Sequence, residues 1–155
     1  MRTAFDCMKT VHKSVLIWFS AEEMFSLVTD VDRYPQFLPW CDQAEVLLRE
    51  AEAMTARVGM SIGGLRQSFT TRNLHQPGRQ VRMELVEGPF SRLDGCWDFT
   101  PLGGPDQRAC KVEFRLSYDF SSSALSALVG PVFERIAGSL VDAFVKRAHQ
   151  VYGSS

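Results

Sequence analysis

The chain has 155 residues, of which 45% are apolar and 23% are charged, and its formal net charge is −1. This composition is typical of a soluble globular domain and argues against a disordered or fibrous protein. A net charge near zero gives no overall attraction to nucleic acid, so we expect one domain over residues 1–155 that binds no DNA.

The first predicted element is a strand. Residues 1–8 show no periodicity and are expected to form a loose N-terminal extension. From Thr10 to Trp18, β-branched and aromatic residues are frequent and apolar groups occur on both alternating faces. This pattern predicts a strand that is covered on much of both sides.

Two short helices are predicted directly after this strand. Ser20 and Glu23 have the spacing of a capping box, in which each side chain bonds the backbone N–H of the other residue, so a helix is expected from Ser20 to about Thr29. A second short helical turn follows, and Pro35 and Pro39 prevent it from growing. The two together predict a helical elbow.

Five segments of strand length follow the elbow, separated by turn residues such as Gly63-Gly64, Pro77-Gly78 and Gly88-Pro89. Apolar residues alternate within each segment, as between Val112 and Phe120, which predicts antiparallel strands joined by hairpins. The residues between the apolar ones are largely charged. One face of the sheet is therefore expected to be apolar and the other to face water.

The period changes near the end of the chain, where apolar residues recur every three or four positions. This spacing predicts one long amphipathic helix from Ser122 or Ser123 to Tyr152. Gly130-Pro131 lies near its start and predicts a kink or a fresh helix N-terminus, because proline lacks the backbone N–H that a helix interior needs.

The predicted elements suggest one architecture. A sheet with one apolar face must bury that face, and the long helix is the only large partner available. We therefore expect an α+β fold in which a curved antiparallel sheet of six to seven strands wraps around the helix. The concave space between them is either filled by core side chains or forms a ligand pocket, and its methionines and aromatic rings suit an adaptable apolar site.

Cysteine and histidine spacings predict no metal site. The four cysteines form no C-x-x-C pair and the three histidines lie far apart, which indicates reduced thiols and no metal. The apolar run Val15–Phe19 is shorter than a membrane span or a signal-peptide core, so we expect a cytoplasmic protein.

Two segments resemble a known family. Residues 32–41, DRYPQFLPWC, resemble the signature segment of the bacterial ribosome-association toxin and mitochondrial coenzyme Q-binding protein family, a branch of the START-like, polyketide cyclase-like superfamily. Residues 87–99, EGPFSRLDGCWDF, look like the second block of this family, and residues 132–148 are similar to its long helix. The resemblance covers about residues 8–152 and implies a START-like helix-grip domain, the same architecture that the periodicity predicts.

The resemblance also implies a function: a non-enzymatic carrier or chaperone that supports respiration by holding an isoprenoid quinone or another apolar lipid, with no other cofactor. The elbow side chains, held by prolines, are expected to act either as a gate at the cavity mouth or as a plug that seals the sheet. The residues expected to line the cavity are Tyr34, Phe37, Leu38, Trp40, Met60, Phe69, Met83, Phe90, Trp97, Phe99, Phe114, Tyr118, Phe133 and Ile136.

Two other functions compete with this one. A cyclase or dehydratase would need a buried carboxylate or histidine, and the predicted concave face carries almost none, since Asp94 and Asp98 fall on the outward phase. A ribosome-associating toxin or translation regulator, the role named for the bacterial branch, would contact the large ribosomal subunit through basic residues of the outer face. The same residues would otherwise pair with acidic residues on neighbouring strands. They are Arg57, Arg66, Arg72, Arg82 and Arg115.

The expected location follows from the N-terminal sequence. It shows no segment rich in arginine and serine, so a bacterial cytoplasmic protein is favoured over a mitochondrial precursor. A carrier of apolar lipid is also expected to meet the membrane surface transiently.

Overall fold

The computed structural model describes residues 9–62 and 64–153, so the predicted loose extension over residues 1–8 lies outside the described residues. In chain order the elements are β1 (Lys9–Ile17), α2 (Ala21–Thr29), the 3-10 helix η1 (Val31–Gln36), β2 (Cys41–Glu50), β3 (Ala53–Ile62), β4 (Leu65–Gln76), β5 (Gln80–Glu87), β6 (Phe90–Pro101), β7 (Cys110–Phe120) and α3 (Ser123–Tyr152).

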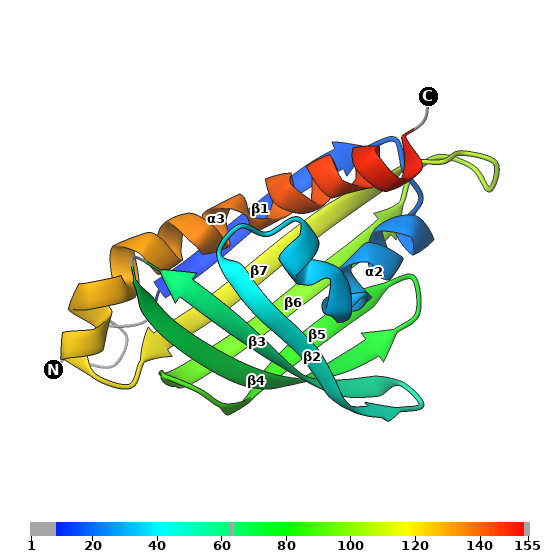
Figure 1. Cartoon of the computed structure of the whole chain (residues 1–155). Coiled ribbons are helices and arrows are strands. Elements are labelled where there is room, and N and C mark those ends of the chain that lie inside the picture. The colour runs from blue at the N-terminus through cyan, green and yellow to red at the C-terminus, as the bar shows by residue number, and fades with distance from the viewer. Residues whose placement is uncertain (1–8, 63, 154–155) are drawn as a thin grey trace, which may run out of the picture.

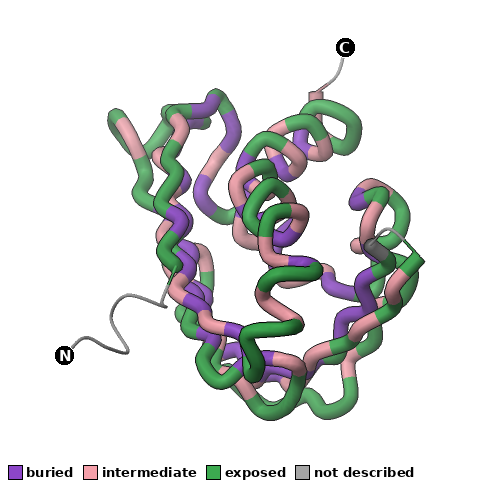
Figure 2. Tube along the Cα trace, turned by 90° about the vertical axis from the view of Figure 1, so that its left-hand side faces the viewer, coloured by how far each residue is buried: buried purple, intermediate pink, exposed green. Residues whose placement is uncertain are grey.

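The seven strands form one sheet in the order β1-β7-β6-β5-β4-β3-β2, and every neighbouring pair is antiparallel. α3 lies along the concave side of this sheet (Figure 1), and the view turned by 90° shows the sheet curving around the helix (Figure 2). The predicted α+β helix-grip architecture is therefore confirmed.

The strand after the elbow, β2, is the element that the alternation pattern did not resolve. The pattern indicated five segments after the elbow, whereas the structure has six strands there. Register shifts interrupt the β2–β3 pairing between Cys41 and Gln43 and between Val46 and Leu48. Each irregularity changes which side chains face inward, so β2 has no continuous period of two.

The elbow forms as the capping pattern predicts. The backbone N–H of Glu23 donates to Ser20 Oγ at 3.0 Å, and the backbone N–H of Ser20 donates to Glu23 Oε1 at 2.8 Å. These reciprocal bonds satisfy two of the N–H groups that the first helical turn leaves without a partner. α2 and η1 are the two short helices expected after the first strand, and Pro35 lies inside η1.

α3 starts at the predicted cap, since Ser122 Oγ accepts a hydrogen bond from the backbone N–H of Leu125 at 3.1 Å. The helix then runs unbroken through Gly130 and Pro131, so of the two predicted alternatives, a kink or a fresh N-terminus, the fresh N-terminus is wrong. Proline removes the hydrogen bond to the carbonyl of Ala127, and that residue is exposed, so water can satisfy the carbonyl.

α3 is long and apolar enough to cross a membrane by length and composition alone. One stripe of it is buried against the sheet, which also explains its apolar composition. The residues of this stripe are Val129, Phe133, Ala137, Val141, Phe144 and Ala148.

Candidate functional site

A cavity of about 90 Å³ lies between α3, the elbow and the inner face of strands β3 to β7. Typical small-molecule pockets have volumes of roughly 300–1,000 Å³. The cavity as it stands is therefore smaller than a drug-sized ligand, and a larger guest requires wall side chains to move. Six wall residues are partly exposed: Tyr34, Trp40, Phe69, Met83, Ile136 and Leu140.

Ten of the fourteen residues expected in the cavity lie on its wall. They come from the elbow, from β3 to β7 and from α3, which shows that the alternation pattern correctly separated inner from outer positions on these strands. The ten are Tyr34, Leu38, Trp40, Met60, Phe69, Met83, Trp97, Phe114, Phe133 and Ile136.

The other four predicted residues pack away from the cavity. Phe90 and Tyr118 both contact the ring of Phe133, with centroid distances of 5.3 and 4.7 Å, and fill one end of the space under α3. Phe99 packs beneath α2, with its ring centroid 6.0 Å from that of Phe25. Phe37 packs behind two wall residues, with its ring centroid 6.0 Å from that of Tyr34 and 5.2 Å from that of Phe144, and the guanidinium of Arg147 lies over its ring.

The described residues that line the cavity include no aspartate, glutamate, lysine, arginine, histidine or cysteine. Tyr34 carries the one phenol of the wall; its hydroxyl donates to the backbone carbonyl of Val28, and burial raises the pKa of this group above its usual value. Tyr34 is therefore neutral at physiological pH, and so is the whole described wall.

Two polar residues of the wall, Thr71 and Asn73, were absent from the residues predicted for the cavity. They lie on the inner face of β4, and Thr71 Oγ1 donates to Asn73 Oδ1 at 2.7 Å. A signal for them exists in the sequence, because the alternation through Leu65, Gln67 and Phe69 continues to positions 71 and 73. Apolar residues alone defined the predicted wall, so these two inward polar side chains were missed.

Several apolar wall residues were also absent from the prediction, because the sequence pattern does not distinguish residues that border a cavity from residues packed in the core. Phe144 of α3 contacts Tyr34, Phe37 and Trp97 at centroid distances of 5.6, 5.2 and 5.2 Å, so it joins the elbow to the sheet. Ala137, one further wall residue of α3, presents only a methyl group to the cavity.

Gly95 of β6 makes room for Met83 of β5, its cross-strand neighbour. A Cβ atom at position 95 would overlap Met83 Cε, so glycine at this position leaves room for the thioether at the cavity. Methionine has flexible rotamers and adapts to irregular space, so Met83 is a wall side chain that can move for a guest.

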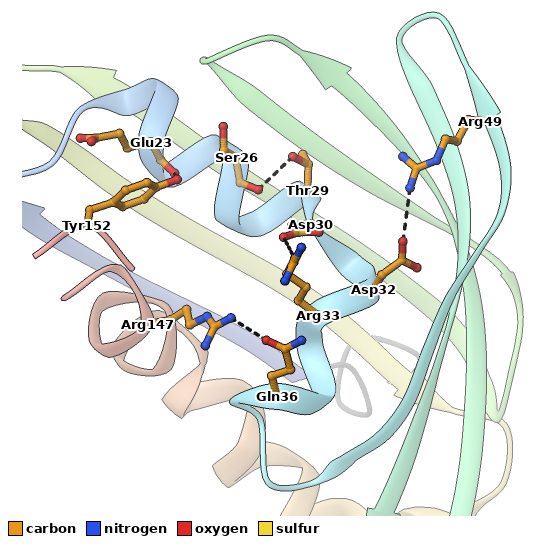
Figure 3. A network of polar contacts seen from close by, with 10 residues as sticks. All are labelled: Glu23, Ser26, Thr29, Asp30, Asp32, Arg33, Gln36, Arg49, Arg147 and Tyr152. Atoms are coloured by element: carbon orange, nitrogen blue, oxygen red, sulfur yellow. Dashed lines mark hydrogen bonds and ion pairs between the residues drawn. The ribbon is translucent and has the colours of Figure 1, made fainter. Parts of the chain in front are cut away.

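Polar contacts fix the elbow to the elements beside it (Figure 3). Arg147 of α3 donates to Gln36 Oε1 at 2.8 Å, and Arg49 of β2 donates to Asp32 Oδ2 at 3.4 Å. Both contacts are exposed, and each contributes about 1 kcal/mol or less. The elbow is thus held on two sides, at α3 and at β2, while Tyr34 reaches from it to the cavity.

The outer face of the sheet carries the five predicted arginines, and three of them form ion pairs. Arg66 lies 2.7 Å from Asp42, Arg72 lies 3.4 Å from Glu50, and Arg115 lies 3.1 Å from Glu113. Within residues 9–62 and 64–153, the other two, Arg57 and Arg82, are exposed and have no acidic oxygen within 4 Å.

Among the described residues, the carboxylates, histidines and cysteines all lie away from the cavity wall. Asp98 accepts a hydrogen bond from Gln80 Nε2 at 2.8 Å on the outer face. Burial raises the pKa of the thiols of Cys41, Cys96 and Cys110 to about 11, so they are protonated and poor nucleophiles. In the part of the chain that the structure describes, no group of histidine, cysteine and carboxylate side chains has the geometry of a metal site.

Comparison with known proteins identifies the family and two named relatives. A family model described as polyketide cyclase / dehydrase and lipid transport matches residues 17–145. The ribosome association toxin RatA of Vibrio cholerae is 48% identical over 146 residues, which are 94% of this chain and 99% of that protein. The mitochondrial coenzyme Q-binding protein COQ10 homolog B of Xenopus laevis is 31% identical over 144 residues, 91% of this chain and 58% of that protein.

The fold is also found among enzymes. The crystal structure of the Zhui aromatase/cyclase from Streptomyces sp. R1128 matches with a TM-score of 0.78 at 16% identity, covering 96% of this chain and 99% of that one. At this identity the likeness concerns the fold alone. The family match and the RatA relative go further: the chain belongs to the polyketide cyclase / dehydrase and lipid transport family, in the branch of the ribosome association toxins.

Proposed function

We propose that the protein binds a neutral apolar molecule of the isoprenoid quinone class in the cavity under α3 and does not convert it chemically. The observation that carries this proposal is the neutral, largely apolar wall. An ionised guest would lose its hydration there without gaining a counter-charge, at a cost of several kcal/mol. A neutral guest loses no such hydration and gains from the burial of its apolar surface.

The relatives support this choice of ligand. COQ10 homolog B is named for coenzyme Q binding, and the family description includes lipid transport. The same description includes cyclases and dehydrases, but their acid–base chemistry needs a titratable group within reach of the substrate. The described cavity wall offers no carboxylate, histidine or lysine, which supports binding without turnover.

A substitution on α3 tests the proposal. Ile136→Lys places a cation at a partly exposed wall position and should abolish binding of a short-chain isoprenoid quinone, measured by quenching of tryptophan fluorescence, since Trp97 lines the cavity. Leu128→Lys is the matched control, because Leu128 lies on the same helix, is 63% exposed and is outside the cavity wall. Equal quenching in both variants and the wild type would show that the quinone binds elsewhere.

A second candidate function uses the outer face. We propose that Arg57 and Arg82, which have no acidic partner among the described residues, contact phosphates of the ribosomal large subunit in a bacterial cytoplasm. The name of the RatA relative and the exposure of these two guanidinium groups favour this candidate. Each phosphate contact releases counterions, so association should weaken steeply as salt is raised, whereas quinone binding should hardly change.

Co-sedimentation with ribosomes tests the second candidate. The double variant Arg57→Glu, Arg82→Glu should lose association, while Arg135→Glu, an exposed position on α3, should keep it. Ribosome binding by the double variant at wild-type strength would rule out this surface. Neither substitution touches the cavity wall, so quinone binding should survive both.

A further inference from the structure

Two polar side chains interrupt the otherwise apolar inner face of the sheet at the cavity. Thr71 and Asn73 are 5% and 7% exposed, and both belong to the cavity wall. Their cross-strand neighbours are Ala56 and Leu85 for Thr71, and Met54 and Met83 for Asn73. None of these four side chains can form a strong hydrogen bond with them, and within the described residues the one side-chain hydrogen bond of the pair is the bond between Thr71 and Asn73.

A count of hydrogen-bond donors shows what the pair offers to the cavity. The threonine hydroxyl and the asparagine amide carry three polar hydrogens in total. One is used in the internal bond from Thr71 Oγ1 to Asn73 Oδ1. Exchanging the amide oxygen and nitrogen changes which hydrogen is used but not the number, so two donor hydrogens remain.

These remaining donors face accessible space. Across residues 9–62 and 64–153, the one fully enclosed side-chain nitrogen or oxygen without a hydrogen-bond partner is Nε2 of His75. The amide nitrogen of Asn73 has no protein partner either, yet it is not among the fully enclosed atoms. We therefore infer that the unused donors of the pair open onto the cavity. A guest that covers them without accepting a hydrogen bond leaves them buried and unpaired, which is unfavourable.

We propose that Asn73, oriented by Thr71, donates a hydrogen bond to a carbonyl oxygen of the bound molecule. The pair then selects a neutral ligand with a carbonyl head group, such as a quinone, over a hydrocarbon of the same tail. This inference rests on the proposed binding function and adds to it the atoms that recognise the head group.

The expected selectivity follows from the cost of an unused donor. A hydrocarbon that displaces water from the pair leaves buried N–H groups without a partner, whereas a carbonyl satisfies one of them. A difference of one such hydrogen bond corresponds to roughly a 10-fold change in the dissociation constant. A purely apolar wall would not discriminate the two ligands in this way.

The double variant Thr71→Val, Asn73→Leu tests the proposal, because it removes both polar groups together, nearly preserves their shape and leaves no unpaired partner behind. Thr70→Val is the matched control: Thr70 is the same residue type on the same strand, 5% exposed and outside the cavity wall. Two probes are titrated into each protein: a short-chain isoprenoid quinone labelled with ¹³C at its carbonyls, and an isoprenoid hydrocarbon of the same tail.

The double variant should bind the quinone about 10-fold more weakly than the wild type and the control do, and should bind the hydrocarbon equally well or better. The infrared carbonyl stretch of the bound quinone should lie at lower frequency in the wild type than in the double variant. Unchanged quinone affinity with an unchanged carbonyl stretch would overturn the anchor while leaving the binding function intact. A wild-type protein that takes up neither probe would overturn both.

Discussion

Filling the cavity should separate stability from ligand binding. Ala137 is 1% exposed and presents its methyl group to the cavity from α3, so Ala137→Leu adds three carbon atoms to this space. Functional pockets are commonly kept open at the expense of stability. We expect the variant to be more stable than the wild type and unable to bind the quinone.

The magnitude follows from the cavity volume. An unfilled cavity destabilises a protein by about 24 cal/mol per Å³, so 90 Å³ corresponds to about 2 kcal/mol. The added side chain loses roughly 0.5–1 kcal/mol of rotamer entropy on burial. A net gain of about 1 to 2 kcal/mol in the free energy of unfolding is therefore expected.

Urea denaturation followed by circular dichroism measures this gain, and the quinone titration measures the loss of binding. Ala124→Leu, at an exposed position in the first turns of α3, is the control and should change neither. A variant that unfolds more easily than the wild type and still binds the quinone would refute the argument, because the space would then be neither empty nor the binding site.

Three further substitutions test the packing and the charges. Phe144→Ala should cost about 3–5 kcal/mol of stability, whereas Leu128→Ala, on the exposed side of the same helix, should cost about 0.5 kcal/mol or less; equal losses in a denaturation experiment would contradict the packing of α3. Glu23→Gln should cost about 1 kcal/mol at neutral pH, through the weakened cap and the lost ion pair with Arg108. Because Arg108 lowers the pKa of Glu23, this difference should disappear in acid, and thermal unfolding at several pH values would show whether the two proteins converge. Burial lowers the pKa of His75, so the wild type should lose stability as the pH falls below the usual histidine range; His75→Gln should lose less over the same interval, and parallel stability curves would argue against a buried neutral histidine.

The parts of the fold that were predictable from sequence are those in which each residue faces either the core or water. In β3 to β7 the alternation of apolar and polar residues marks which side chains face the core, and in α3 apolar residues spaced three or four apart do the same. β2 was harder to predict because its two register shifts break the alternation. Pro131 suggested a kink or a fresh N-terminus, but the helix continues through it, and the carbonyl of Ala127 that loses its hydrogen bond is at an exposed position.

The cavity wall was predictable by face but not by position along each strand. Phe90 and Phe99 have the inward phase, yet one packs in a ring cluster at the end of α3 and the other beneath α2. Only the curvature of the sheet and the path of α3 decide which inward positions border open space. Thr71 and Asn73 show a second limit, since a search restricted to apolar residues excludes the polar groups that give an apolar site its selectivity.

Native mass spectrometry of the freshly purified protein, followed by organic extraction and identification of any bound molecule, tests ligand binding in the cavity. We expect a neutral, carbonyl-bearing apolar lipid such as an isoprenoid quinone, present in the wild type and absent from Ala137→Leu. Protein that is empty when purified and that takes up no quinone when titrated would show that the cavity does not bind this ligand, and a bound molecule that carries a charge within the cavity would rule out the proposed ligand class.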